Sequence, residues 1–147
     1  KQKQWNRSYM STIQVEIVSA ERDIFSGEAS MVVAPGKDGD LGIAPKHTPL
    51  LTTLRPGDIE VHKAEGEIEY IYVSGGILEV QPHIVTVLAD SAQHVSELDE
   101  EAVLKAKNDA EEALKGVSKK EELEHAQAQL AEAAARYNSI KRLKGKK

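Results

Sequence analysis

The chain changes its sequence pattern once, close to residue 96, and that change limits the folds available to it. All five prolines and eight of the ten glycines precede Leu98, where turn signals recur roughly every ten residues. From Leu98 onward the chain has no proline and only two glycines. Short segments between turns are typical of antiparallel sheets, whereas long unbroken segments are typical of helices. The sequence therefore predicts a β domain over residues 10–95 and an α-helical domain over residues 96–147.

Alternating apolar residues identify the first strand. Between Thr12 and Val18, Ile13, Val15 and Ile17 alternate with polar residues, which predicts a strand with one buried face. Aromatic residues make up only 4% of the chain, so the core is expected to consist mainly of Val, Ile, Leu and Ala.

The remaining strands follow the same rhythm. A second strand is expected at residues 22–26, ending at Gly27, and Ala29, Met31 and Val33 are expected to share one buried face. Further strands are predicted at residues 47–54, 58–62, 67–73, 77–80 and 84–88. This spacing is typical of an antiparallel β-sandwich or barrel and not of βαβ units.

The loop from Gly36 to Gly42 contains three glycines and two aspartates. It does not match a phosphate-binding P-loop, because Gly36-Lys37 comes first and no Gly-Lys-Ser/Thr follows. It does not match an EF-hand, because only Asp38 and Asp40 occupy ligand positions. The sequence therefore predicts a tight turn between strands, in which glycines supply positive φ angles.

Two helices are predicted after Ser96. Asp99 is expected to cap the first helix and Gly116 to end it. Ser118 is expected to cap the second helix, with Glu121 as its partner in a capping box. Because the connection is short, the two helices are expected to form an antiparallel hairpin.

Each predicted helix has an apolar stripe at three- and four-residue spacing. The first stripe consists of Val103, Ala106, Ala110, Ala113 and Val117, and the second of Leu123, Ala126, Leu130, Ala133, Tyr137 and Ile140. Alanine buries little area, so a hairpin of this composition is marginally stable alone. We expect it either to lie on the β domain or to detach and find another partner.

Composition excludes several classes of function. There is no cysteine, which rules out disulfides and thiolate sites, and the five histidines show no metal-ligand spacing. The net charge of −5 argues against nucleic acid as a partner. No apolar run is long enough to span a membrane. We find no set of residues typical of an active site, so the sequence predicts a protein that is not an enzyme by itself and that needs no metal or cofactor.

Both ends of the chain carry basic residues. Residues 1–9 precede Met10 and lack the apolar core of a signal peptide, so we interpret them as an unstructured extension or a cloning remnant. The other end is a basic tail, formed by Lys141, Arg142, Lys144, Lys146 and Lys147.

Several segments, in order along the chain, resemble the epsilon subunit of bacterial F-type ATP synthases, which is called delta in mitochondria. The matching residues are Val18–Glu21, Phe25–Gly27, Gly39–Ile43, Pro45–Thr52, Pro56–Gly57, Tyr72–Pro82, Val85–Asp90 and Leu98–Glu100. The resemblance runs from about Met10 to the end of the chain, and no single short motif carries it.

The resemblance implies a β-sandwich of ten strands followed by two antiparallel helices. It also implies a non-catalytic rotor subunit of the central stalk, peripheral to the cytoplasmic face of the bacterial inner membrane. The sandwich would bind the gamma subunit, with His47 in the approaching segment, and would sit on the ring of c subunits. The residues implied to face the c ring are Gly36, Asp38, Gly39, Asp40, Leu41 and Gly42.

The resemblance implies a regulatory role for the hairpin. In the family it can extend along gamma into the catalytic head and inhibit ATP hydrolysis, where the basic tail would suit an acidic surface of the alpha and beta subunits. The residues implied for this role are Leu123, Leu130, Tyr137, Ile140, Lys141 and Arg142.

Some relatives bind ATP through a hairpin motif of Ile or Leu, Asp, two variable residues, Arg and Ala. Here Ala102 replaces the arginine and Val103 the alanine, so phosphate binding should be weak and only Asp99 remains as a candidate. An N-cap is the favoured interpretation of Asp99. Two alternatives stay open: a nucleotide-sensing module whose hairpin closes on ATP, and, less favoured, a stand-alone β-sandwich enzyme.

Overall fold

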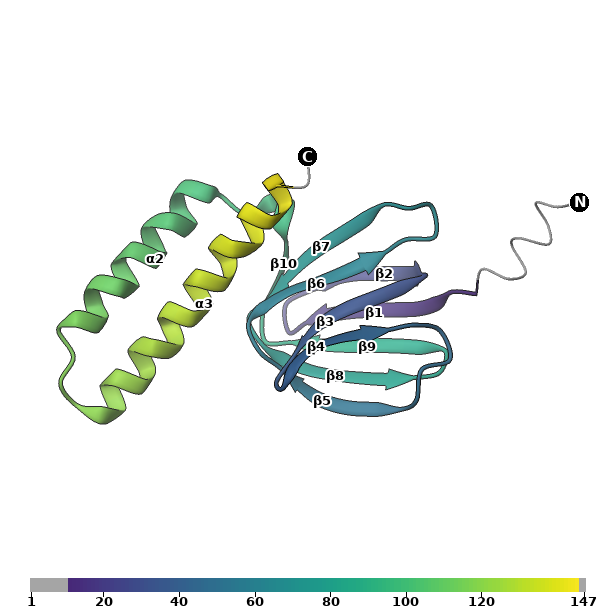
Figure 1. The fold of residues 1–147 in the computed structure, drawn as a ribbon, viewed down its shortest axis with the longest axis horizontal. Helices are drawn as coiled ribbons and strands as arrows, with labels where there is room; N and C mark the ends of the chain where they lie inside the picture. The colour runs from purple at the N-terminus through teal and green to yellow at the C-terminus, as the bar shows by residue number, and fades with distance from the viewer. Residues whose placement is uncertain (1–10, 146–147) are drawn as a thin grey trace, which may run out of the picture.

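The computed structural model describes residues 11–145 of the chain. The predicted extension at residues 1–9, Met10, Lys146 and Lys147 lie outside the described residues. In the described part, ten strands are followed by one short 3-10 helix and two long α-helices (Figure 1). The predicted architecture, a β-sandwich followed by an antiparallel two-helix hairpin, is therefore confirmed.

The strands are short, as expected where turns recur so often. They are β1 (Ile13–Ser19), β2 (Asp23–Ala29), β3 (Met31–Gly36), β4 (Gly39–Ile43), β5 (Leu50–Leu54), β6 (Gly57–His62), β7 (Ile68–Val73), β8 (Gly76–Gln81), β9 (Ile84–Ala89) and β10 (Ala92–His94). The helical elements are η1 (Val95–Glu97), α2 (Glu100–Lys115) and α3 (Lys120–Gly145).

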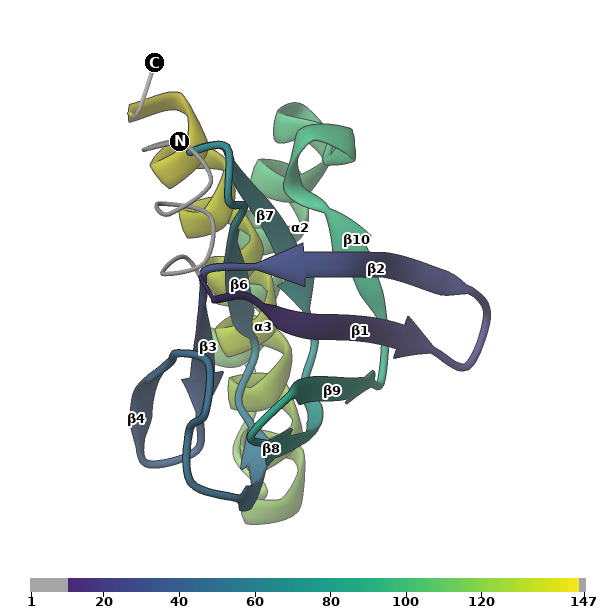
Figure 2. The ribbon, with the colours of Figure 1, turned by 90° about the vertical axis from the view of Figure 1, so that its right-hand side faces the viewer.

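The sheet curves around one apolar interior (Figure 2). Its hydrogen-bonded order is β10-β7-β6-β3-β5-β8-β9-β1-β2, with β4 paired to β3. The strand pairs are antiparallel except β1 and β9, which run parallel and place Val15 beside Val85. The chain thus departs from a purely antiparallel sandwich at this one pair.

The main core lies between the layers of the sandwich. Ile13, Val15 and Ile17 are fully buried, so the alternation in the first strand is confirmed. They pack with aliphatic residues from the other strands, including Val32, Ile59, Ile71, Leu78, Val80, Val85 and Val87. Each such side chain contributes about 1.5–3 kcal/mol by leaving water, which stabilises this half of the chain.

Two sequence predictions around the second strand are wrong. Strand β2 continues through Gly27, which pairs with Val15. Ala29 is buried as predicted, but beyond it Val32 and Ala34 are buried, whereas Met31 is exposed and Val33 only half-buried. The cause is a bend at Ser30, which ends one strand and starts the next, so the alternation does not continue in phase.

Two further boundaries differ from the prediction. The segment from Gly36 to Gly42 is mostly strand, with a tight turn at Lys37 and Asp38, and Gly39 has the predicted positive φ of 140°. Strand β5 starts at Leu50 and not at residue 47. Pro49 lies directly before it, and proline lacks the N–H needed in a strand ladder.

The caps of α2 agree with the sequence prediction. The Asp99 side chain accepts hydrogen bonds from the backbone N–H groups of Glu101 (3.1 Å) and Ala102 (3.4 Å), and Gly116 follows the last helical residue. The predicted cap at Ser118 is wrong, because α3 begins at Lys120, one residue later than such a cap requires. No helix of the described part is long and apolar enough to cross a membrane.

A second, smaller apolar cluster joins the hairpin to the sandwich. It contains Tyr70 and Tyr72 from β7, Val95 from η1, Val103 from α2 and Ile140 from α3. Helix α3 lies between α2 and the sandwich (Figure 1) and contacts β6, β7 and η1. The hairpin is therefore docked on the β domain, mainly through α3.

Candidate functional site

The predicted c-ring segment forms the β3–β4 hairpin, which projects from the sandwich (Figure 2). Its turn exposes Asp38, Gly39 and Asp40, while Gly36 is buried. The Arg55 guanidinium donates to the Gly36 carbonyl and to the Asp40 carboxylate, both at 2.5 Å. Asp40 is thus tied to the sandwich by Arg55 although it is exposed, and Asp38 is the acidic side chain at the tip.

Leu41 and Gly42 complete the predicted segment further along β4. Leu41 is half-buried and packs against the main core, whereas Gly42 is exposed. His47 lies in the connection between β4 and β5, where its Nδ1 is 2.7 Å from the Thr48 carbonyl oxygen. The segment implied to approach gamma therefore leads directly into β5.

The outer face of β5, β8 and β9 carries an exposed apolar patch, here called the apolar patch: Leu51, Ile77 and Leu88. Their exposed fractions are 69%, 46% and 53%. Ile77 of β8 pairs with Leu88 of β9 and, on its other side, with Thr53 of β5. Leu51 lies two residues before Thr53, on the same face of β5. Contiguous exposed apolar side chains of this kind mark an interaction surface.

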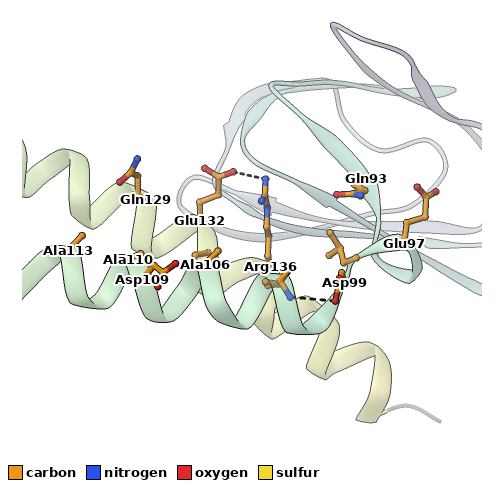
Figure 3. A pocket seen from close by; sticks show the side chains of 14 residues that line it. Gln93, Glu97, Asp99, Ala106, Asp109, Ala110, Ala113, Gln129, Glu132 and Arg136 are labelled. Atoms are coloured by element: carbon orange, nitrogen blue, oxygen red, sulfur yellow. Dashed lines mark hydrogen bonds and ion pairs between the residues drawn. The ribbon is translucent and has the colours of Figure 1, made fainter.

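A groove of about 670 Å³ lies between α2, α3 and the end of the sandwich (Figure 3). Its floor is formed largely by small side chains, namely Ala102, Ala106, Ala110, Ala113 and Ala133. Asp99 lies at one end, and Arg136 projects into the groove, where its Nη2 lies 3.0 Å from a Glu132 carboxylate oxygen. The weak alanine stripes of the two helices thus leave a groove where they face each other.

Tyr72 connects the sandwich to α3. Its hydroxyl donates a hydrogen bond to the Glu132 carbonyl oxygen at 3.3 Å, and the Arg136 guanidinium lies 5.3 Å from its ring centre. Burial raises the pKa of Tyr72 to about 12, and the nearby Glu132 carboxylate acts in the same direction. The phenol is therefore neutral at physiological pH and can remain in an apolar contact.

Polar contacts hold the C-terminal part of α3. The Arg142 guanidinium donates to the Asp58 carboxylate of β6 at 2.8 Å, and the Lys144 ammonium pairs with Glu100 of α2. Only 4% of the Asp58 side chain is exposed. In this arrangement Arg142, predicted for the inhibitory surface, is bound to the sandwich.

The residues predicted for the inhibitory surface differ in accessibility. Ile140 is buried, Leu123, Leu130 and Tyr137 are half-buried, and Lys141 and Arg142 are exposed. The Lys141 ammonium lies 5.4 Å from the Tyr137 ring centre. In the docked hairpin, the apolar members of this set therefore contact the rest of the chain.

Sequence reasoning missed Arg55, Asp58, Arg136 and the apolar patch. Asp58 and Arg142 are 84 residues apart, so no local pattern joins them. The sequence could have indicated the apolar patch. Leu51, Ile77 and Leu88 are each adjacent in the chain to an apolar residue that packs in the main core. Apolar runs on strands indicate that both faces are covered, either within the chain or by a partner.

Comparison with known proteins identifies two matching domain families. Residues 12–95 match "ATP synthase, Delta/Epsilon chain, beta-sandwich domain", and residues 96–141 match "ATP synthase, Delta/Epsilon chain, long alpha-helix domain". The ATP synthase epsilon chain of Alkalilimnicola ehrlichii is 56% identical over 135 residues, covering 92% of this chain and 96% of the relative. That of Delftia acidovorans is 49% identical over 138 residues, covering 94% of this chain and 100% of the relative.

Solved structures that resemble this fold include chains of two mitochondrial ATP synthases. A chain of the Euglena gracilis OSCP/F1/c-ring structure aligns with a TM-score of 0.79 at 18% identity, covering 88% of this chain and 81% of that one. A chain of the Tetrahymena thermophila central stalk/c-ring structure aligns with a TM-score of 0.63 at 13% identity, covering 88% and 97%. At such identities these likenesses show the fold alone. The two domain matches, in order, and the high identity to the curated relatives show that this chain belongs to the ATP synthase delta/epsilon chain family.

Proposed function

We propose that the sandwich attaches this chain to the gamma subunit and the c ring of an F-type ATP synthase, as a non-catalytic part of the rotor. The apolar patch is the observation that supports a gamma-binding face. Leu51, Ile77 and Leu88 are exposed side by side on a stiff sheet, and burying them under a partner would be favourable. His47, the predicted gamma contact, lies shortly before strand β5, and β5 carries Leu51 of the apolar patch. The predicted contact and the patch are therefore close along the chain.

The c-ring contact is assigned to the β3–β4 hairpin. Its exposed tip presents Asp38 and Gly39 to a partner, and Arg55 fixes its base by bonding to the Gly36 carbonyl and Asp40. A polar tip on a fixed base can press on a polar ring surface without burying an unpaired charge. In such a complex the chain would be peripheral to the cytoplasmic face of the bacterial inner membrane.

The hairpin is proposed to act as a separate regulatory unit, over residues 96–147, against a sandwich over residues 10–95. Its contact with the sandwich is a small cluster centred on Tyr72 and Ile140, and α2 touches the sandwich little. Undocking would expose Ile140 and Tyr137 beside the basic residues Lys141 and Arg142. Leu123 and Leu130 lie earlier in α3, outside this cluster. These six residues are the groups that would contact the alpha and beta subunits and inhibit ATP hydrolysis.

Deletion of the hairpin tests this function. A complex reconstituted with a chain that lacks Leu98–Lys147 should retain assembly but hydrolyse ATP faster than the complex with the full chain. Assembly is checked by co-purification with gamma. Unchanged hydrolysis in a fully assembled complex would refute the inhibitory role, and loss of assembly would refute the assignment of gamma binding to the sandwich.

Nucleotide sensing is a second candidate function, and the groove between the helices is the observation that favours it. The groove has room for a small ligand and contains Asp99 and Arg136. Its lining nevertheless carries four carboxylates, from Glu97, Asp99, Asp109 and Glu132, against one guanidinium. That balance repels triphosphate, so calorimetry with ATP on the full chain should show no binding at micromolar concentrations, and a micromolar Kd would reverse this ranking.

A further inference from the structure

One charge pair with a buried carboxylate spans the boundary between the sandwich and the hairpin. The Asp58 carboxylate extends from β6, and the Arg142 guanidinium reaches it from the last turns of α3, with 2.8 Å between Nη1 and Oδ1. The second carboxylate oxygen, Oδ2, is buried and has no hydrogen-bond partner within residues 11–145. Within the described residues, the ion pair of Asp58 is with a group on the hairpin, since Arg55, which lines the same cleft, pairs with Asp40.

Docking of α3 helps to bury Asp58. A small cleft of about 150 Å³ is lined by Asp58 and its neighbours on the sandwich and by Ala135, Asn138 and Arg142 from α3. Helix α3 contacts β6 along this cleft. When α3 leaves, both the carboxylate and the guanidinium become available to water, so the burial and the pairing exist together in the docked state.

We propose that Asp58 and Arg142 form a latch that sets the equilibrium between the docked and the free hairpin. A buried carboxylate that loses its partner is strongly unfavourable, whereas the same carboxylate in water is not. Removing Arg142 leaves the Asp58 carboxylate buried without its partner, and removing the Asp58 charge loses the attraction that holds Arg142. Each change therefore penalises the docked state. The pair does not lie within either apolar cluster, so its loss leaves the core of the sandwich intact.

The latch makes two contacts of Arg142 mutually exclusive. This step rests on the proposed function. In the docked hairpin Arg142 binds Asp58, and in the free hairpin it can bind an acidic surface of the catalytic subunits. An acidic partner surface thus competes with one sandwich carboxylate for one guanidinium. The two halves of the latch therefore have different roles: Asp58 acts only in the docked state, and Arg142 acts in both.

The experiment uses thiol labelling of the full chain. The chain has no cysteine, so Ser139→Cys introduces a single thiol at a position that is 1% exposed in α3. Ser139 is four residues after Ala135 and three before Arg142, so it lies on the face of α3 that meets the sandwich. Under conditions where docking is fast, the labelling rate measures the population of the free hairpin.

Asp58→Asn and Arg142→Gln should each raise the labelling rate roughly tenfold, a modest value because Arg142 is half exposed. The double variant should label no faster than the single ones, because both remove the same interaction. Added salt should accelerate labelling of the parent chain but not of the double variant. Lys115→Gln is the matched control, since it removes an exposed pair with Glu112 inside α2 and should leave the rate unchanged.

A paired apolar replacement distinguishes loss of the ion pair from general destabilisation by substitution at these two positions. Asp58→Leu with Arg142→Leu should label as slowly as the parent and lose the salt dependence, since an apolar pair of similar volume fills the contact without burying charge. Labelling rates of the single latch variants equal to that of Lys115→Gln, or strictly additive effects in the double variant, would overturn the latch.

Hydrolysis by the reconstituted complex separates the latch from the proposed function. Asp58→Asn should slow ATP hydrolysis, because it frees a hairpin whose Arg142 is intact, and Arg142→Gln should slow it less. If both variants label faster in the isolated chain while hydrolysis stays unchanged, the latch stands and the inhibitory role fails. If neither labels faster, the latch fails whatever the hydrolysis rate.

Discussion

The substitution Ile140→Ala tests whether the hairpin and the sandwich are separate units. Ile140 is 5% exposed and belongs to the small cluster with Tyr72, apart from the main core. Truncation of a buried isoleucine costs about 2–5 kcal/mol. Several neighbours in this cluster are only partly buried, which favours the lower end, about 2 kcal/mol.

This loss of free energy should weaken the docking of the hairpin and leave the stability of the sandwich unchanged. A change of about 2 kcal/mol corresponds to a roughly 30-fold larger population of the free hairpin. The two helices are marginal without tertiary contacts, so their amides should exchange with solvent through this free state. Hydrogen exchange followed by mass spectrometry should therefore show about 30-fold faster exchange in α2 and α3, with β1 and β9 unchanged.

Leu78→Ala is the matched control, because Leu78 is fully buried in the main core. It should lower the global stability and accelerate exchange in the most protected strands. If Ile140→Ala accelerates exchange in β1 and β9 as much as in the helices, the chain unfolds as one cooperative unit. The division into a stiff sandwich and a detachable hairpin would then be wrong.

Three further predictions concern other parts of the chain. Asp99→Ala should remove the cap of α2 and cost about 1 kcal/mol, seen as a lower midpoint of helix melting by circular dichroism; an unchanged midpoint would refute the cap. Burial raises the pKa of Tyr72 from 10.0 to about 12. The neutral phenol should therefore contribute fully to the stability of the docked hairpin below pH 10, and this contribution should be lost as pH rises toward 12. Tyr72→Phe should abolish this loss in a fluorescence-monitored pH titration, and a pH dependence equal to that of the parent would contradict the assignment. Gly76→Ala should destabilise the sandwich by at least about 1–3 kcal/mol in urea unfolding, because Gly76 has φ 142° and an added Cβ would lie 2.3 Å from the Leu88 carbonyl oxygen; a variant as stable as the parent would show that the turn relaxes.

Local patterns predicted the elements whose structure is decided locally. The alternation of Ile13, Val15 and Ile17 gave a correct strand, because one face of β1 is buried along its whole length. Asp99 and Gly116 gave the correct ends of α2, because caps depend on the backbone of the adjacent turn. The phase error at Met31 arose where a single bend separates two strands.

Contacts between distant segments could not be predicted in the same way. Strand β7 is buried on both faces, since Ile71 and Val73 enter the main core while Tyr70 and Tyr72 meet the hairpin. The sequence predicted a strand at residues 67–73 but not its burial on both faces, and nothing in the strand identified α3 as the cover. The pairing of Asp58 with a residue of α3 likewise depends on the angle at which α3 docks, which no local spacing determines.

Binding of the full chain to isolated gamma subunit tests most directly whether the sandwich binds the central stalk through the apolar patch. In titration calorimetry the parent chain should bind gamma, and a variant with Leu51→Glu and Ile77→Glu should bind at least about 100-fold more weakly, since a charge replaces each buried apolar contact. Both side chains are exposed in the free chain, so the variant should keep the melting temperature of the parent. Equal binding by the folded variant, or no binding by the parent, would contradict the account.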